Sequence, residues 1–457
     1  MNREQASLSV DTLELLKAKI LKSAIEGKLV PQIEGEPEAL QIGKAPEEVS
    51  FEIPKKWKWI RLDSLTDYIQ RGKSPKYSEV KKIPVVSQKC NQWSGFEIDK
   101  ARFIDPDTIS KYSEERKLQD LDLLWNSTGT GTIGRVAVYE SKLNPFDTAV
   151  ADSHVTVVRV DKELMLPKFL YWFLRSPFVQ QSIESLADGS TNQKELATRT
   201  IKNVLVPVPP LEEQKRIVEK VDCLFSKINV IQKSRDEVSQ LSDLLEKQLL
   251  QSAIKGQLIP QLDDEAAVTQ IGQSPEVVPF EIPKKWKWVR ISDILTKLTD
   301  GEHKTPKYRE EGVPFLSVKD ISSGKIDFSQ TKFISKEDFE IFKKRCNPQK
   351  GDILLSKVGT TGVPAIVEED RDFGLFVSVA LLKPDSSLIR SDFLYYQILS
   401  PHVQQQAKNN TRGVGNKNWV LKDIAKTLVV LPPLEEQKRI VEKLDKLMLE
   451  IHKLKQS

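Results

Sequence analysis

FEIPKKWKWIRL at residues 51–62 returns, almost unchanged, as FEIPKKWKWVRI at residues 280–291. Two more pairs of segments match. SAIEGKLVPQ at 23–32 returns as SAIKGQLIPQ at 252–261, before each copy of the first segment. PPLEEQKRIVEK at 209–220 returns unchanged at 432–443, after each copy. The copies are 223 to 229 residues apart, which is far longer than the repeat of a solenoid or a propeller. The chain is therefore predicted to contain two copies of a whole domain, each with its own connecting segments.

The sequence between these matching segments agrees less well. FLYWFLRSPFVQQ at 169–181 corresponds to FLYYQILSPHVQQ at 393–405, and DLLW at 122–125 corresponds to DILL at 352–355. The ends of the two copies are shared while their middles differ, so we expect two bodies of one fold with different surfaces.

Helical segments flank each body. The first copy runs as a helix over residues 10–29, a body, and a second helix from residue 211, and neither glycine nor proline interrupts residues 211–255. One helix of that length would span roughly 68 Å. Ser234 and Glu237 have the spacing of a capping box, so the alternative is that a second helix begins there.

Apolar residues recur at steps of four and three along the helices that follow each body. This spacing is typical of a helix pair with coiled-coil-like packing. The predicted seam residues are Ile217, Val221, Leu224, Ile228, Ile231, Ile440, Leu444, Leu447, Ile451 and Leu454.

The fold class expected from these patterns is α+β, with two similar mixed α/β bodies separated by long antiparallel helices in a pseudo-twofold duplication. The predicted divisions are an N-terminal helix and linker at 1–50, the first body at 51–208, a central helical spacer and linker at 209–279, the second body at 280–431, and a C-terminal helix at 432–457.

Charge is distributed unevenly along the 457 residues, although the formal net charge is only +4. The first body carries 24 basic and 20 acidic side chains and the second carries 25 and 19, so both bodies are basic and the remaining segments are net acidic. Basic bodies on an acidic support suit a repeating polyanion such as duplex DNA. No apolar run approaches the length of a membrane helix, and the N-terminus lacks the pattern of a secretion signal, so we expect a cytoplasmic protein.

Three motifs resemble cofactor or metal sites without the context that such sites need. Gly129, Gly131 and Gly134 spell G-x-G-x-x-G, but the RVAVYE that follows alternates like a strand, which favours a glycine-rich hairpin over a dinucleotide site. Gly72-Lys73-Ser74 lacks the first glycine of a phosphate-binding loop.

The third motif is the order of Pro106, Asp107, Glu115 and Lys117, which imitates that of metal-dependent nucleases but is absent from the second copy. The three cysteines and four histidines are too scattered for a metal site. We therefore predict no catalytic residues and no metal ligands.

The whole chain resembles the specificity subunits of type I restriction-modification enzymes. The resemblance rests on the repeated E-I-P-K-K-W-K-W, on D-L-L and D-I-L followed by glycine-rich turns, and on P-P-L-E-E-Q-K-R-I-V after each body. It implies two target recognition domains that read the halves of a bipartite, asymmetric site on double-stranded DNA. It also implies a non-catalytic protein with two methyltransferase subunits and with restriction subunits as partners, and these partners, not this chain, would use adenosylmethionine, ATP and Mg²⁺.

Base reading requires Arg or Lys toward guanine and Asn or Gln toward adenine, with other cations on the phosphates. Polar loops in both bodies supply these residue types. The candidate DNA-binding residues are Arg71, Lys73, Lys76, Tyr77, Gln88, Lys89, Asn91, Gln92, Ser190, Thr191, Asn192, Gln193 and Lys194 in the first body, and His303, Lys304, Lys307, Tyr308, Lys319, Arg412, Asn416, Lys417 and Asn418 in the second.

The repeated tryptophans Trp57, Trp59, Trp286 and Trp288 alternate along strand-like segments, which indicates structural contacts instead of base stacking. Two other functions remain as alternatives: a self-sufficient DNA nuclease or methyltransferase, and a duplicated scaffold that binds acidic proteins.

Overall fold

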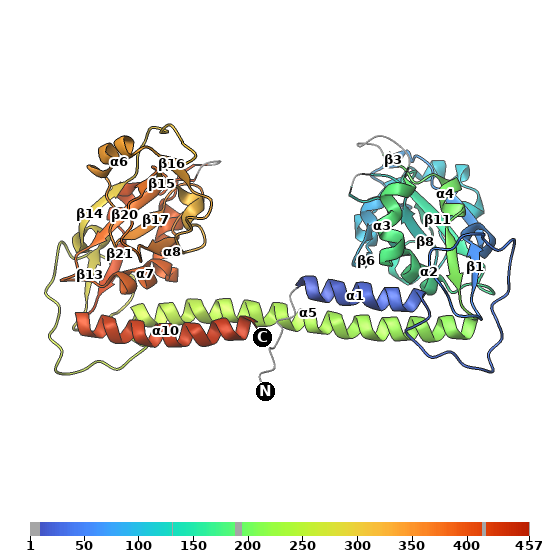
Figure 1. Ribbon diagram of the computed structural model, residues 1–457, viewed down its shortest axis with the longest axis horizontal. Coiled ribbons are helices and arrows are strands. Elements are labelled where there is room, and N and C mark those ends of the chain that lie inside the picture. The colour runs from blue at the N-terminus through green and yellow to red at the C-terminus, as the bar shows by residue number, and fades with distance from the viewer. Residues whose placement is uncertain (1–9, 130, 188–193, 414–416, 457) are drawn as a thin grey trace. The chain divides into compact units, whose positions relative to one another are not determined.

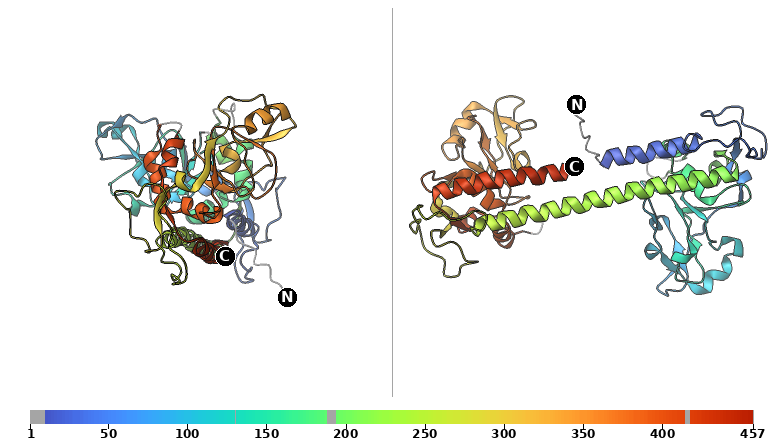
Figure 2. Two further views of the ribbon diagram at one scale, coloured as in Figure 1. Left: turned by 90° about the vertical axis from the view of Figure 1, so that its left-hand side faces the viewer. Right: turned by 90° about the horizontal axis from the view of Figure 1, so that it is seen from below.

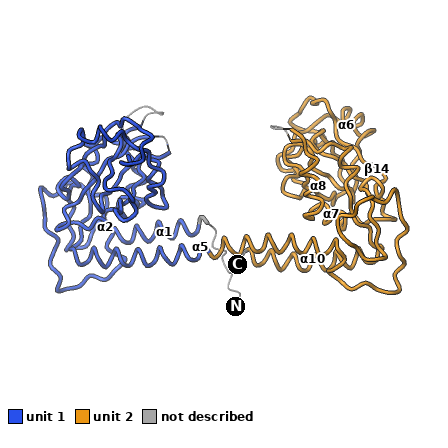
Figure 3. Tube along the Cα trace, turned by 180° about the vertical axis from the view of Figure 1, so that it is seen from behind, with its two compact units in different colours: residues 1–233 blue, residues 234–457 orange. Residues whose placement is uncertain are grey.

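The computed structural model describes residues 10–129, 131–187, 194–413 and 417–456 (Figure 1). The chain divides into unit 1, residues 1–233, and unit 2, residues 234–457 (Figure 3). Both units mix helices with short strands. Among the described residues, no helix is both long and apolar enough to cross a membrane.

Unit 1 contains two four-stranded sheets. The first has the order β2-β11-β8-β9, with all neighbours antiparallel, and the second has the order β10-β4-β7-β3. Strands β1 and β12 form a separate antiparallel pair, and β5 and β6 another. The strands are β1 (Lys58–Arg61), β2 (Thr66–Arg71), β3 (Tyr77–Ser78), β4 (Pro84–Val86), β5 (Asn91–Gln92), β6 (Gly95–Phe96), β7 (Arg102–Ile104), β8 (Leu123–Asn126), β9 (Val136–Val138), β10 (Val150–Ala151), β11 (Val155–Val160) and β12 (Leu205–Val208).

Unit 2 repeats this arrangement with a smaller second sheet. Its first sheet has the order β14-β20-β17-β18, its second has the order β16-β15-β19, and β13 pairs with β21. The strands are β13 (Lys287–Arg290), β14 (Leu295–Asp300), β15 (Val313–Leu316), β16 (Lys332–Ile334), β17 (Ile353–Ser356), β18 (Pro364–Ile366), β19 (Gly374–Leu375), β20 (Val379–Pro384) and β21 (Leu428–Leu431).

The α-helices of unit 1 are α1 (Val10–Ile25), α2 (Pro167–Leu174), α3 (Pro177–Leu186) and α4 (Thr198–Lys202), and those of unit 2 are α6 (Lys336–Lys343), α7 (Ser391–Leu399), α8 (Pro401–Asn410), α9 (Leu421–Ala425) and α10 (Leu434–Gln456). Helix α5 (Leu211–Ile254) is continuous over 44 residues, and the boundary between the units falls within it. The prediction of one long helix is thus confirmed, and the alternative, in which a second helix begins at Ser234, is wrong.

Each part of α5 packs against a second helix. In unit 1 its first part shares a core with α1, and in unit 2 its last part shares a core with α10 (Figure 2). Ile217, Val221 and Ile228 are buried, as are Ile440, Leu444 and Ile451, while Leu224 and Leu447 are half-buried. The seam prediction is wrong for Ile231 and Leu454, whose side chains remain 41% and 54% exposed. Leu454 lies in the last described turn of α10.

The repeated P-P-L-E-E-Q explains how each long helix is fixed to its unit. The amide nitrogen of Gln214 donates to the carbonyls of Leu164 and Pro209 at 3.0 and 2.9 Å, and its amide oxygen accepts from the backbone of Leu166 at 2.8 Å. Gln437 makes the equivalent three bonds in unit 2, to Leu388, Pro432 and Arg390.

The repeated tryptophans lie in the cores, as the alternation of the sequence predicted. Trp57, Trp59, Trp286 and Trp288 are at most 7% exposed. The indole nitrogen of Trp286 donates to Glu436 of α10 at 2.8 Å, so this ring also connects its unit to the helix. Burial raises the pKa of the Glu436 carboxyl.

Candidate nucleic-acid interface

In unit 1 the predicted loops meet at one edge of the first sheet. The last residue of β2 pairs with the start of β11, and β11 begins opposite the last residue of β8. The segment after α3 joins this edge, because the backbone of Leu196 donates to Ser127 at 2.8 Å and Thr128 bridges to Glu195. We call residues 71–77, 88–92, 127–129, 131–135 and 194–196 the loop edge of unit 1.

Glycine permits the close approach of strands at this edge. A side chain at Gly72 would lie 2.2 Å from the carbonyl oxygen of Ala151, and one at Gly301 in unit 2 would lie 2.0 Å from that of Leu375. Both contacts are with backbone, which cannot give way. The repeated glycine therefore fixes where each loop leaves its strand.

Several basic candidates of unit 1 are held by neighbours at the loop edge. Arg71 forms an ion pair with Glu195, and the ammonium group of Lys73 donates to the carbonyl of Lys111 at 2.6 Å. Lys76 is exposed and lies 2.7 Å from Asp105, and this hydrogen bond raises the pKa of the lysine.

Residues 88–92 are tied to the glycine-rich hairpin between β8 and β9. The hydroxyl of Thr132 donates to Gln88 at 2.8 Å, and Arg135 donates to the amide oxygen of Gln92 at 3.1 Å. Asn91 is fully buried and donates to Asn126 at 2.8 Å, so it supports the loop and is not available to a base. Direct base contact by Asn91 is therefore a wrong prediction, whereas Lys89 is exposed.

The hairpin itself confirms the interpretation of the three glycines. β8 and β9 pair directly, and Gly129, Gly131 and Gly134 all have positive φ. The next element in the described part of the chain is strand β9, whereas a dinucleotide site would require a helix there.

Unit 2 forms a corresponding edge. Val358, which follows β17, bridges to Asn418, and the backbone of Gly359 donates to the carbonyl of Lys417 at 2.9 Å. Arg412 is exposed and lies 3.3 Å from Asp423. Exposed side chains at this edge also include His303, Lys304, Lys307, Tyr308 and Lys319.

Five predicted residues lie outside the described part of the chain: Ser190, Thr191, Asn192, Gln193 and Asn416. Lys194, which follows the first four, is half-buried.

Unit 2 also contains a buried carboxylate that the sequence did not predict. Asp300, at the end of β14, is 3% exposed and forms ion pairs with Arg345 and with Lys357, the latter at 3.1 Å. Its oxygen also lies 3.1 Å from the ring nitrogen of His303. Two other loops, which carry Arg345 and Lys357, are thereby held to this carboxylate. Arg71 occupies this strand position in unit 1, so the two edges differ in charge at equivalent places.

Two cations on strands were also not predicted from the sequence. The guanidinium of Arg102 on β7 lies 3.4 Å from the ring centre of Tyr77, and the ammonium of Lys332 on β16 lies 4.0 Å from that of Tyr308. Both rings are partly exposed, at 38% and 39%. The signal available was the repeated P-K-Y that ends in each tyrosine, but nothing in the sequence linked that tripeptide to a cation 25 residues later in unit 1 and 24 residues later in unit 2.

The described residues show little that resembles a catalytic centre. No group of three or more His, Cys, Asp or Glu among them lies close enough to hold a metal ion. Burial raises the pKa of Cys90, and it raises that of Cys346 to about 12, so neither thiol is a ready nucleophile.

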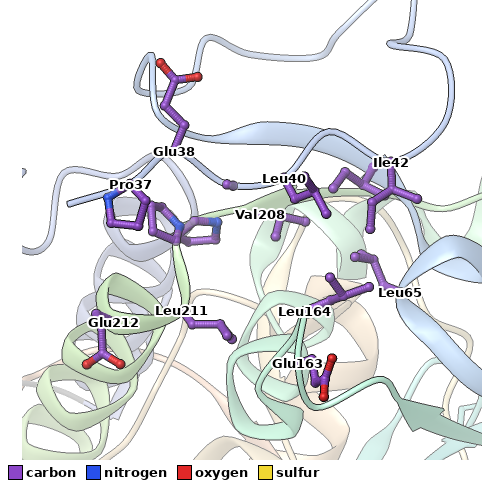
Figure 4. Close-up of a pocket in the computed structure, with 14 residues that line it drawn as sticks. Pro37, Glu38, Leu40, Ile42, Leu65, Glu163, Leu164, Val208, Leu211 and Glu212 are labelled. Carbon is purple, nitrogen blue, oxygen red and sulfur yellow. The ribbon is translucent and has the colours of Figure 1, made fainter.

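A cavity of about 240 Å³ in unit 1 lies away from the loop edge, beneath residues 37–42 (Figure 4). Leu40, Leu65, Leu164 and Val208 are among its lining residues, and the carboxylate of Glu38 points away from it. An apolar hollow without convergent polar groups is not the expected form of an active site.

Comparisons with known proteins agree with this geometry. A family model described as the type I restriction modification DNA specificity domain matches residues 54–240 and 283–457. The chain is 28% identical over 306 residues to the EcoBI specificity subunit of Escherichia coli, a match covering 66% of this chain and 63% of that protein. It is 23% identical to the EcoKI specificity subunit of Escherichia coli strain K12, with 86% of this chain and 82% of the relative covered.

Two solved structures share the fold. One comes from work described as the structural basis of complex assembly and conformational transition of the type I R-M system. The chain matches it with a TM-score of 0.66 and 21% identity, with 89% of this chain and 93% of that chain covered. The HsdS subunit from Thermoanaerobacter tengcongensis matches with a TM-score of 0.53 and 20% identity over the same shares. Because the family model covers most of the sequence in two copies, the chain belongs to the type I restriction modification DNA specificity family.

Proposed function

We propose that this chain is the DNA specificity subunit of a type I restriction-modification enzyme and that each unit reads one half of a bipartite, asymmetric site. The observation that carries this proposal is the loop edge found in both units, built on the same strands but from unlike side chains. Arg71 in unit 1 and Asp300 in unit 2 occupy the same strand position with opposite charge. Surfaces so different would recognise different base sequences.

The long helices act as a spacer in this proposal. Helix α5, at about 1.5 Å per residue, is roughly 66 Å long. Paired with α1 at one end and α10 at the other, it would hold two recognition domains in a pseudo-twofold arrangement. Duplex DNA presents equivalent faces about 34 to 36 Å apart, so a stiff connector would select the number of base pairs between the half-sites.

The chemistry belongs to partner proteins. Two methyltransferase subunits would modify adenines with adenosylmethionine after the base leaves the stack, and restriction subunits would use ATP and Mg²⁺. This chain would bind none of these cofactors and would act in the cytoplasm, where the DNA lies.

Methylome sequencing tests the proposal. A bacterial strain that expresses the chain with its methyltransferase partner should carry methyladenine at one bipartite motif, and a strain with the partner alone should not. The purified chain with adenosylmethionine, or with Mg²⁺ and DNA, should modify and cleave nothing. Turnover by the chain alone would favour an enzyme. If the partner methylates the same motif without this chain, then this chain has no role in recognition.

A further inference from the structure

Both units carry a cation over an exposed tyrosine at the same place in the fold. Arg102 lies opposite Val85 in the pairing of β4 with β7, and Lys332 lies opposite Phe315 in the pairing of β15 with β16. Their tyrosines each follow a proline and a lysine, in Pro-Lys-Tyr. The cation and the ring thus occupy equivalent positions in both units, with the same strand register, although the strands around them differ in sequence.

A second cation recurs nearby. Lys89 and Lys319 each stand second in a short 3₁₀ helix, Gln88–Cys90 in unit 1 and Val318–Ile321 in unit 2, that begins two residues after β4 or β15. Both lysines are exposed. In unit 2, Tyr308, Lys319 and Lys332 line one hollow of about 630 Å³, so the two cations and the ring face a common space.

The residues beside this repeated set are not repeated. Gln88 in unit 1 corresponds to Val318 in unit 2, and Arg71 corresponds to Asp300. Each unit therefore has, at and beside its loop edge, basic residues that both units share and other residues that differ between them.

The two halves of an asymmetric site differ in their bases but share the same sugar-phosphate backbone. Contacts to phosphate position a protein without reading sequence, whereas contacts to base edges specify it. Residues that two unlike readers have in common are thus expected at the backbone. We propose that Arg102 and Lys89 in unit 1, and Lys332 and Lys319 in unit 2, bind DNA phosphates, and that selectivity resides in the unlike residues beside them. This inference rests on the proposed function.

Salt dependence of binding tests the assignment. The full chain would be purified with its methyltransferase partner, and its affinity measured from low to moderate salt for two duplexes: the methylome-derived site and the same length with both half-sites scrambled. R102A, K89A, K332A and K319A should each weaken binding to both duplexes by the same factor. Each should also reduce the slope of log affinity against log salt by about 0.9.

Lys162→Ala and Lys350→Ala are the matched controls. Both lysines are exposed. Lys162 follows the end of β11, whose start lies at the loop edge, and Lys350 precedes the start of β17, whose end lies at the loop edge. They should leave both slopes unchanged. Arg102→Lys should keep the slope of the unchanged chain, because the charge is retained.

The outcomes separate the two proposals. If the unchanged complex binds neither duplex at any salt concentration, the DNA-reading function fails, and the phosphate assignment with it. If it binds but the four alanine variants keep its slope, only the phosphate assignment is overturned. A variant that loses affinity for the cognate site alone, or shifts the methylated motif, would identify a base-reading residue and would also overturn it.

Discussion

The imidazole of His402 stands edge-on to the indole of Trp288, with the ring centres 5.4 Å apart. Phe280 completes the group at 5.2 Å from the imidazole, and the histidine's Nε2–H donates to the carbonyl of Leu428 at 3.1 Å. In unit 1 the corresponding group is Phe51, Trp59 and Phe178, so a phenylalanine occupies the place of the histidine.

Acid should destabilise unit 2 through this histidine. Burial lowers the pKa of His402, so the unfolded chain binds its proton more tightly than the folded chain does. The contribution to stability is therefore complete above the unfolded value of about 6.5 and is lost as the pH falls toward the folded pKa. His402→Phe should remove this contribution, which thermal unfolding at pH 7.5 and pH 5.5 would measure as a smaller drop in Tm. Phe178→His is the reciprocal variant and should add acid sensitivity; equal drops in all three proteins would contradict the assignment.

The buried ion pair of Asp122 with Arg159 should be costly to break. Two bonds of 2.8 Å join the carboxylate to the guanidinium, and the two side chains are 1% and 14% exposed. Asp122→Ala leaves the arginine without this partner and should lower the free energy of unfolding by about 3 to 5 kcal/mol. Urea denaturation would measure the loss. The double variant Asp122→Leu with Arg159→Met should recover much of it, and a double variant as unstable as the single one would show that packing, not charge, is responsible.

Gln437 should be needed to hold α10 to unit 2. Gln437→Leu leaves the backbone N–H of Arg390 and the carbonyls of Leu388 and Pro432 without their partner, at a cost of about 1 to 3 kcal/mol for each buried group left unsatisfied. Hydrogen exchange of the α10 amides should accelerate. Lys438→Ala, at the exposed neighbouring position, is the control. Unchanged exchange in the glutamine variant would show that apolar contacts alone fix the helix.

Features that repeat at short range were predictable from the sequence. The spacing of Ile217, Val221 and Ile228 identified buried positions on a helix, and the glycines at 129–134 identified a hairpin, because both depend on local periodicity and turn geometry. The continuous α5 followed from the absence of glycine and proline.

Contacts between distant segments were not predictable. Asn91 has the residue type of an adenine reader, but it is buried because its side chain donates to Leu124 and Asn126 of β8, a contact that local sequence does not encode. Arg102 and Lys332 reach their tyrosines only through strand register. Asp300 meets Arg345 and Lys357 from two other loops, so its role depends on topology and not on neighbours in the chain.

We infer that one stiff helix sets the distance between two unlike DNA readers. Four residues, Ala-Glu-Ala-Lys, inserted between Gln232 and Val238 would lengthen α5 by about 6 Å, close to two base pairs. The same insertion in the linker at residues 263–273, which contains neither helix nor strand, is the control. Methylome sequencing of strains carrying each variant with the methyltransferase partner is the direct measurement. The helix insertion should keep both half-sites and lengthen the gap between them by one or two base pairs while the linker insertion leaves it unchanged; an unaltered gap with the longer helix would contradict the account.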